Sequence, residues 1–313
     1  MTDTTENDQE EWPDVHRPHD KLFKLTFREK ERLADFMKHH LPTEVTGLMD
    51  LANLRIEPET FLDEKFSENY SDIIAQVNLS GKPAFVYFLF EHKSAPDEQA
   101  VWQFLQYMVQ QWKKDLEDKK GLIPVIPVLF THGERLWEYK TFPELFKDVP
   151  KILLEYIPDF RYILHDISPE AKTKIQGGII IRIVQLLMRA AAGKDREDEI
   201  LEALELMGLL ADLDNGERWM EILFRYILAT TNIRLEKLTV KLREARLTKG
   251  EDFIMSTMQK LIDKGFEKGI EQGIEQNKLE TARGMLARNY PLEDVLAITG
   301  LSREELTRAG ILR

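Results

Sequence analysis

The stretch Val86–Lys93, VYFLFEHK, decides the fold prediction, because an apolar run ends there on an acid, an imidazole and an amine. A second β-prone run, Tyr70–Leu79 (YSDIIAQVNL), lies upstream, and the turn residues Ser80–Pro83 (SGKP) separate the two. Two such runs joined by a short turn that contains Gly are typical of a hairpin. The sequence therefore predicts two antiparallel strands, with the ionisable residues where the second strand ends.

The centre of the turn sets which residues face each other. With the turn centred on Gly81 and Lys82, Asp72 stands directly opposite Glu91. Alternate residues of a strand share a face, so Lys93 joins these two carboxylates and the His92 side chain points the other way. A loop of odd length would destroy this arrangement.

Two carboxylates placed opposite each other repel, and the pair is unfavourable by itself. A divalent cation reverses the sign of the interaction, because Mg²⁺ and Mn²⁺ prefer oxygen ligands. The ammonium of Lys93, on the same face, can hold a water for attack on phosphorus and offset the developing charge. Charges at a solvated strand end are the alternative interpretation of Glu91 and Lys93 taken alone.

The flanking segments predict a mixed α/β core. Asp20–His40 has apolar residues at helical spacing, and short β-prone runs follow from Ile56. Asp97–Lys119 is again helical, and Pro124–Gly133 (PVIPVLFTHG) is typical of a strand covered on both faces. The segments that can be assigned beyond Pro169 are helical.

Several motifs occur in one order along the chain: HDKLFKLTF, HHLP, FLDEKFSENYSDIIAQV, FEHKSAPD, QFLQYMVQQW and PVLFTHGERLW. Together with Asp72 and Glu91-His92-Lys93 they resemble the recombination-promoting nuclease (Rpn) and putative transposase family of the PD-(D/E)XK superfamily. Ser71 stands where the name of the superfamily motif has Pro, which leaves the metal-binding carboxylate in place. The likeness covers residues 16–190 and extends to the GIEQGIEQ stretch near the C-terminus.

The resemblance implies a restriction-endonuclease-like core, a mixed sheet flanked by helices, followed by an all-helical C-terminal region. It also implies a metal-dependent endonuclease acting on DNA in bacterial recombination or mobile-element biology. Carried onto this chain, Asp72, Glu91 and the backbone carbonyl of His92 would bind Mg²⁺ or Mn²⁺, or another divalent cation. Lys93 would be the catalytic lysine.

Three further residues are candidates for support of the site or contact with phosphate. Asp20 opens the first helix, where an N-cap is an equally good interpretation. Gln106 and Tyr107 lie on the helix after Lys93, where ordinary helix packing is the alternative.

The chain divides into four predicted parts: a disordered acidic tail (1–15), a nuclease-like domain (16–190), a helical extension (191–250) and a C-terminal helical region (251–313). Gly265, Gly269 and Gly273 recur every four residues in the last part, and each glycine within a helix costs about 1 kcal/mol. This row favours homo-oligomerisation through close helix contacts, and a solvated linker also fits it. The end of the chain reads as a small helix-turn-helix-like unit, for which an interaction role is favoured over reading DNA.

The composition narrows the functional classes. A net charge of -12 opposes general coating of nucleic acid, so a nuclease would need a local basic cleft. The absence of cysteine excludes disulfides and thiolate metal sites, and it suits the cytoplasm. No apolar run is long enough for a membrane span. The alternative function is a DNA- or protein-binding partner with a nuclease-like scaffold, including a role in defence against foreign DNA; a transposase with an RNase-H-like set of acids fits less well.

Overall fold

The computed structural model describes most of the chain, in two compact units, Met1–Glu251 and Asp252–Arg313. The described residues are 17–57, 71–91, 99–193, 196–231, 278–286, 290–312 and single positions between 233 and 263. The predicted tail (1–15), His92, Lys93 and the three spaced glycines lie outside the described residues.

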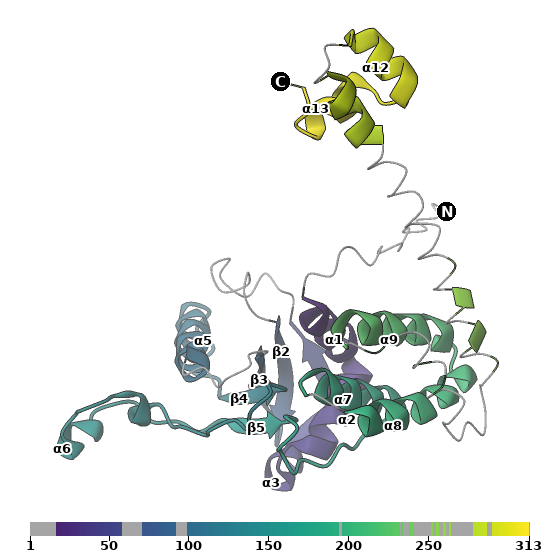
Figure 1. Ribbon diagram of the computed structural model, residues 1–313. Helices are drawn as coiled ribbons and strands as arrows, with labels where there is room; N and C mark the ends of the chain where they lie inside the picture. The colour runs from purple at the N-terminus through teal and green to yellow at the C-terminus, as the bar shows by residue number, and fades with distance from the viewer. Residues whose placement is uncertain are drawn as a thin grey trace, which may run out of the picture. The chain divides into compact units, whose positions relative to one another are not determined.

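A mixed five-stranded sheet forms the centre of the first unit, with the strands in chain order (Figure 1). The strands are β1 (Met49–Ile56), β2 (Ser71–Leu79), β3 (Lys82–Glu91), β4 (Val125–Thr131) and β5 (Ile163–Asp166). The pairs β1–β2 and β2–β3 are antiparallel, whereas β3–β4 and β4–β5 are parallel. This sheet and the helices after it confirm the predicted α/β class, although the first strand begins at Met49 and not at Ile56.

The β2–β3 turn differs from the predicted one. Ser80 and Gly81 have φ values of 49° and 83°, the positive angles that both central residues of a type I′ turn require. Lys82 precedes Pro83, which favours extended backbone, so Lys82 is a strand residue and pairs with Leu79. The turn is therefore centred on Ser80 and Gly81, and the predicted centre at Gly81 and Lys82 is wrong.

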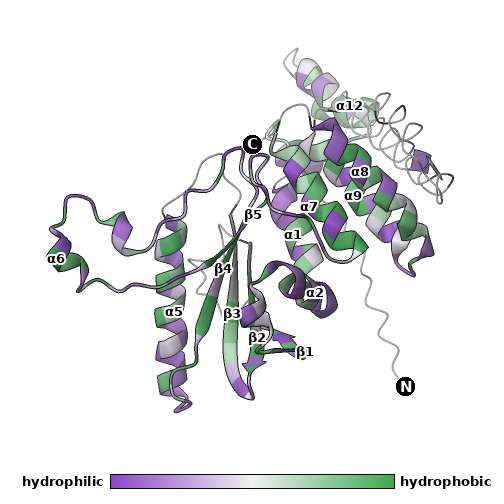
Figure 2. Cartoon of the chain, turned by 90° about the horizontal axis from the view of Figure 1, so that it is seen from below, coloured by the Kyte–Doolittle hydropathy of each residue, from purple (hydrophilic) through white to green (hydrophobic). Residues whose placement is uncertain are grey.

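Helix α5 (Gln99–Glu117) covers one face of the sheet and connects β3 to β4 (Figure 2). A parallel pair needs such a crossover. Ile74, Phe85 and Leu129, from three strands, pack in one buried cluster with Phe104 of α5. The predicted helix over Asp97–Lys119 is thus confirmed within two residues at each end.

The other face packs against α1 (Pro18–Phe27) and α2 (Lys30–His40). The ring of Phe130 on β4 lies with its centroid 5.4 Å from that of Phe23 and 5.7 Å from that of Phe36. The single helix predicted over Asp20–His40 is divided in two, because Glu29 has extended backbone and serves as the N-cap residue of α2.

The remaining elements of the first unit are short or lie in its helical half. They are α3 (Thr43–Thr46), η2 (Pro143–Leu145), α6 (Lys151–Leu154), α7 (Ile179–Ala191), α8 (Glu197–Met207), η3 (Gly208–Asp212) and α9 (Gly216–Thr230). Among the helices of the described residues, none is both long enough and apolar enough to cross a membrane.

The second unit has its own small core. Helical residues 278–286, α12 (Leu292–Thr299) and α13 (Arg303–Arg308) enclose Ala282, Val295, Leu301 and Leu306. The Ser302 side chain caps α13 in a reciprocal capping box with Glu305, which holds the Glu305 carboxylate at the start of the helix. Burial of four apolar side chains and this cap define a compact helical element.

Candidate functional site

Asp72 and Glu91 lie near the same end of the β2–β3 hairpin, but they are not direct partners. Asp72 pairs with Leu89, so Glu91 lies two residues beyond the position opposite Asp72. The predicted direct opposition is wrong, because it assumed the wrong turn centre. A shift of two residues preserves the alternation of faces, whereas a shift of one would reverse it. The two positions are diagonal neighbours, about 7–8 Å apart instead of about 5 Å.

These two positions belong to the face of the sheet that α5 covers. Ile74 and Phe85 have the same strand parity as positions 72 and 91, and both pack in the cluster under α5. The hairpin thus brings Asp72 and Glu91 to one face at the carboxyl end of β3. Their side chains, like His92 and Lys93, are not among the described groups.

The neighbouring strands end at the same level as β3. Thr131 pairs with both Glu91 and Asp166 across β4. The buried Asp166 carboxylate accepts hydrogen bonds from the backbone N–H groups of Trp137 at 2.8 Å and Ser168 at 2.7 Å. Asp166 therefore fixes the loops that leave β4 and β5.

A second group of side chains ties α1 to this edge of the sheet. His132 follows β4 directly and is fully buried, with its ring centroid 4.7 Å from that of His19. Nδ1 of His19 lies 2.7 Å from the Tyr226 hydroxyl on α9. The start of α1 is thereby held beside the end of β4. Both histidines fall in the quoted motifs, which is a weak signal for this contact in the sequence.

The supporting candidates have separate environments. Asp20 is half-buried in the first turn of α1, but Arg17 is the N-cap residue, so the N-cap interpretation of Asp20 is wrong. An acid in a first turn interacts favourably with the helix dipole. Tyr107 is 5% exposed and packs in the α5 cluster, as ordinary helix packing predicts, while Gln106 beside it is half-buried.

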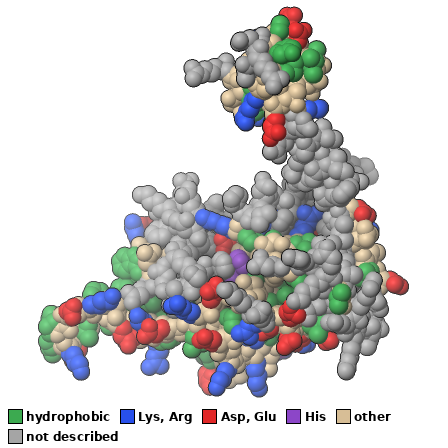
Figure 3. Space-filling view, in the orientation of Figure 1, with side chains coloured by type: hydrophobic (Ala, Val, Ile, Leu, Met, Phe, Trp, Pro, Cys, Tyr) green, Lys and Arg blue, Asp and Glu red, His purple; other side chains and the backbone are tan. Residues whose placement is uncertain are grey.

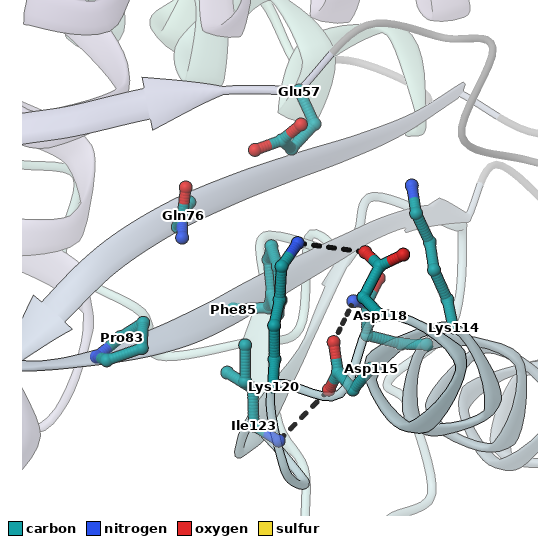
Figure 4. A pocket seen from close by; sticks show the side chains of 10 residues that line it. Glu57, Gln76, Pro83, Phe85, Lys114, Asp115, Asp118, Lys120 and Ile123 are labelled. Carbon is teal, nitrogen blue, oxygen red and sulfur yellow. Dashed lines mark hydrogen bonds and ion pairs between the residues drawn. The ribbon is translucent and has the colours of Figure 1, made fainter.

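A cavity of 440 Å³ lies on the same face of the sheet, nearer the β2–β3 turn (Figure 4). Its lining residues come from the end of β1, β2, β3, α5 and the segment after α5: Glu57, Gln76, Pro83, Phe85, Gln111, Lys114, Asp115, Asp118, Lys120 and Ile123. Sequence reasoning missed this cavity, because its walls come from segments far apart in the chain.

The carboxylate of Asp115, which is buried in the wall of the cavity, accepts two hydrogen bonds. Asp115 is 2% exposed and accepts from Nε2 of Gln111 at 2.8 Å and from the Ile123 N–H at 3.0 Å. At the surface, Nζ of Lys120 lies 2.9 Å from Asp118. Their hydrogen bond raises the pKa of Lys120 and lowers the pKa of Asp118. Both surface groups therefore stay charged at neutral pH.

Within the described part of the chain, no three histidine, aspartate or glutamate side chains gather as a metal site. On the face drawn in Figure 3, the described Lys and Arg side chains alternate with Asp and Glu.

Comparisons with known proteins identify one matching family model and several named relatives. A family model described as "Putative transposase, YhgA-like" matches residues 17–218. Recombination-promoting nuclease RpnA of Escherichia coli K12 is 29% identical over 94% of this chain and 97% of its own length. The E. coli K12 protein named inactive recombination-promoting nuclease-like protein RpnE is 25% identical over 92% of this chain and 96% of its own. RpnD of E. coli O157:H7 is 28% identical over 61% of this chain and 82% of its own. No solved structure matches the chain significantly.

Proposed function

The chain belongs to the family of YhgA-like putative transposases, which includes the Rpn proteins, and from this premise we propose that it is a metal-dependent DNA endonuclease. In this proposal the reaction is hydrolysis of phosphodiester bonds. The enzyme would act in DNA recombination or mobile-element biology, and it would be located in the cytoplasm. The family includes a protein named inactive, so membership of the family is not by itself an argument that this chain is active. The proposal therefore depends on the residues of the site.

The supporting observation is the shared face of positions 72 and 91. The diagonal offset leaves more room between the two residues than direct opposition would, and carboxylate oxygens are the ligands that Mg²⁺ and Mn²⁺ prefer. In this proposal Asp72, Glu91 and the His92 backbone carbonyl hold the ion. A bound divalent ion supplies Lewis-acid polarisation of the phosphate and a more acidic water.

The remaining groups of the chain act on water and charge. Lys93 lies outside the described residues, and the proposal keeps it on the face of Glu91 as strand alternation predicts from the sequence; there its ammonium would hold the attacking water and offset charge on the phosphate. Asp20 enters the proposal as support, because α1 begins beside the end of β4. Gln106 is kept as a candidate for phosphate contact.

Metal-dependent nicking of plasmid DNA tests this function. With Mg²⁺ or Mn²⁺, Asp72→Asn, Glu91→Gln and Lys93→Met should each lower the rate by at least about 100-fold, since each removes a charge used in the transition state. Lys82→Met, at the exposed start of β3, and Glu138→Gln, whose side chain is 74% exposed, serve as controls that should keep full activity. Equal nicking by all these proteins would sink the proposal.

A second candidate function is a DNA- or protein-binding partner that keeps the nuclease fold as a scaffold, for example in defence against foreign DNA. It is favoured by the likeness to RpnE, a protein named inactive, and by the net charge of -12. DNA binding by the wild type without cleavage in either metal would favour this candidate over the enzyme.

We also propose homo-oligomerisation through residues 251–313, on the basis of the four-residue spacing of Gly265, Gly269 and Gly273. Replacing all three by Leu would prevent close helix approach. Light scattering of the full chain should then give a smaller mass than the wild type, and an unchanged mass would contradict this proposal.

A further inference from the structure

The connection from β4 to β5 forms an arm (residues 132–162) that extends away from the sheet, past α5 (Figure 1, Figure 2). Connections longer than about 12–15 residues are uncommon in compact domains and, where they are ordered, usually have a function. The two helical turns of the arm, η2 and α6, have no buried residue. The far part of the arm is therefore an exposed extension of the first unit.

Aromatic contacts hold the root of the arm against α5. The ring of Phe142 stacks on Trp102 of α5, with centroids 6.0 Å apart, and on Phe160, with centroids 5.9 Å apart. The rings of Tyr139 and Tyr162 stack with centroids 4.3 Å apart, which joins the outgoing and the returning segments of the arm. Because these contacts preorganise the arm, a partner that binds it has less conformational freedom to remove.

Large apolar side chains are exposed on two surfaces of this region, and they are between 44% and 81% exposed. The arm-tip patch consists of Phe146, Ile152, Leu153 and Tyr156. The α5 stripe consists of Trp102, Val109 and Leu116. The residues of the stripe recur every seven positions, so they lie on one side of the helix. In Figure 3, hydrophobic side chains gather at the left, where Figure 1 draws α6. Grouped apolar side chains of this kind mark interaction surfaces.

The two patches together have the area that a specific dimer needs. A large side chain presents about 150–250 Å², so these side chains, a little over half exposed on average, leave about 800 Å² uncovered. A standard protein interface buries about 800 Å² on each partner. A contact that used only one of the two patches would fall well below this area.

The charges beside the two patches favour a second copy of the chain as the partner. The chain as a whole carries a net charge of -12, so two copies repel each other in most orientations. Residues 146–161, around the arm tip, contain three basic and three acidic residues, and residues 99–120, around the stripe, contain four lysines and three acids. Both patches therefore lie in nearly neutral parts of an acidic chain, where two copies can approach each other.

We propose that two copies of the chain exchange arms, so that the arm-tip patch of each copy packs on the α5 stripe of the other. Each apolar patch then has an apolar partner, and one twofold axis generates two equal contacts. This contact lies within the first unit and leaves out residues 251–313, so it differs from the contact proposed for the spaced glycines. It also does not depend on the proposed nuclease activity.

The absence of cysteine from the chain makes disulfide trapping a direct test. Val109→Cys and Tyr156→Cys each place one thiol on one of the two patches of the full chain. After mild oxidation, a mixture of these two variants should give at least about tenfold more covalent dimer than either variant alone, because a disulfide needs close thiols. Leu48→Cys is the control, since Leu48 is 54% exposed but belongs to neither patch.

The control mixture, Leu48→Cys with Tyr156→Cys, should give only background dimer. As much covalent dimer in the control mixture as in the test mixture would overturn the arm exchange. Efficient dimer formation by Val109→Cys alone or by Tyr156→Cys alone would also overturn it, because the stripe would then contact a stripe, or a tip would contact a tip.

Sedimentation equilibrium of the full chain measures the strength of the contact. Val109→Glu and Tyr156→Glu should each raise the dissociation constant of the dimer by at least about tenfold, because each places a carboxylate in an apolar contact. Leu48→Glu should leave it within about twofold of the wild type. Thermal unfolding checks that the variants are folded. Unchanged dissociation constants for both Val109→Glu and Tyr156→Glu would contradict the proposal.

The two proposed contacts between copies fail separately. In the full chain with Gly265, Gly269 and Gly273 all replaced by Leu, the sedimentation mass should be that of a dimer, and adding Tyr156→Glu should give a monomer. A monomer before Tyr156→Glu is added would overturn the arm exchange and leave the glycine contact. A mass that changes with Tyr156→Glu but not with the three Leu replacements would support the arm exchange and overturn the glycine contact.

Discussion

At the scale of single residues, the burial of His165 makes the stability of the fold depend on pH. It is 3% exposed on β5, and its Nε2 donates to Oε1 of Gln185 at 2.7 Å. Burial lowers its pKa to about 3, and repulsion from His40 and Arg189 acts in the same direction. Burial also lowers the pKa of His40, whose ring centroid is 4.4 Å from that of His165. The folded state therefore holds His165 neutral.

A lowered histidine pKa makes stability fall in acid. The unfolded chain takes up this proton near pH 6.5 and the folded chain only near pH 3, so the contribution is fully present above about pH 6.5. As the pH falls from about 6.5 toward about 3, protonation of His165 in the unfolded chain should lower the free energy of unfolding by about 1.4 kcal/mol for each pH unit.

Urea unfolding of His165→Gln between pH 4.5 and 7 measures this term. The variant should be less stable at pH 7 but should show a shallower fall in acid. His39→Gln is the control, because His39 lies on the exposed side of α2, and it should retain the slope of the wild type. Parallel curves for the wild type and His165→Gln would refute the assignment.

At the scale of elements, the sequence predicted the strands of the β2–β3 hairpin but not the register in which they pair. Alternation and turn composition predicted the two strands and the shared face of Asp72 and Glu91. They did not give the register, because Gly81 can occupy either central position of a turn. The residue that decides is Lys82, which Pro83 confines to extended backbone.

The hairpin turn can be tested directly. Gly81 has φ 83°, a region that costs other residues about 1–2 kcal/mol, so Gly81→Ala should lower the free energy of unfolding by that amount. Ser80→Asn should leave it unchanged or raise it slightly, because Asn tolerates positive φ. Equal stability of Gly81→Ala and the wild type in chemical unfolding would argue against the type I′ turn.

At the scale of the whole first unit, the face of the sheet that α5 covers carries both the proposed catalytic positions and the 440 Å³ cavity. The motifs that follow one another in a fixed order along the sequence were sufficient to predict the α/β class and the candidate residues Asp72 and Glu91. The cavity was not predictable, because Glu57, Gln76 and Lys114 come from three separate segments of the chain and share no pattern in the sequence. Such a site follows from strand register and helix placement, which periodicity does not specify.

Metal binding by Asp72 and Glu91 is the central claim, and titration calorimetry with Mn²⁺ tests it most directly. The wild type should bind one ion per chain at this site, and both Asp72→Asn and Glu91→Gln should weaken that binding by at least about tenfold, because each removes an anionic oxygen ligand. Glu138→Gln should bind like the wild type. Unchanged Mn²⁺ affinity in both Asp72→Asn and Glu91→Gln would contradict the account.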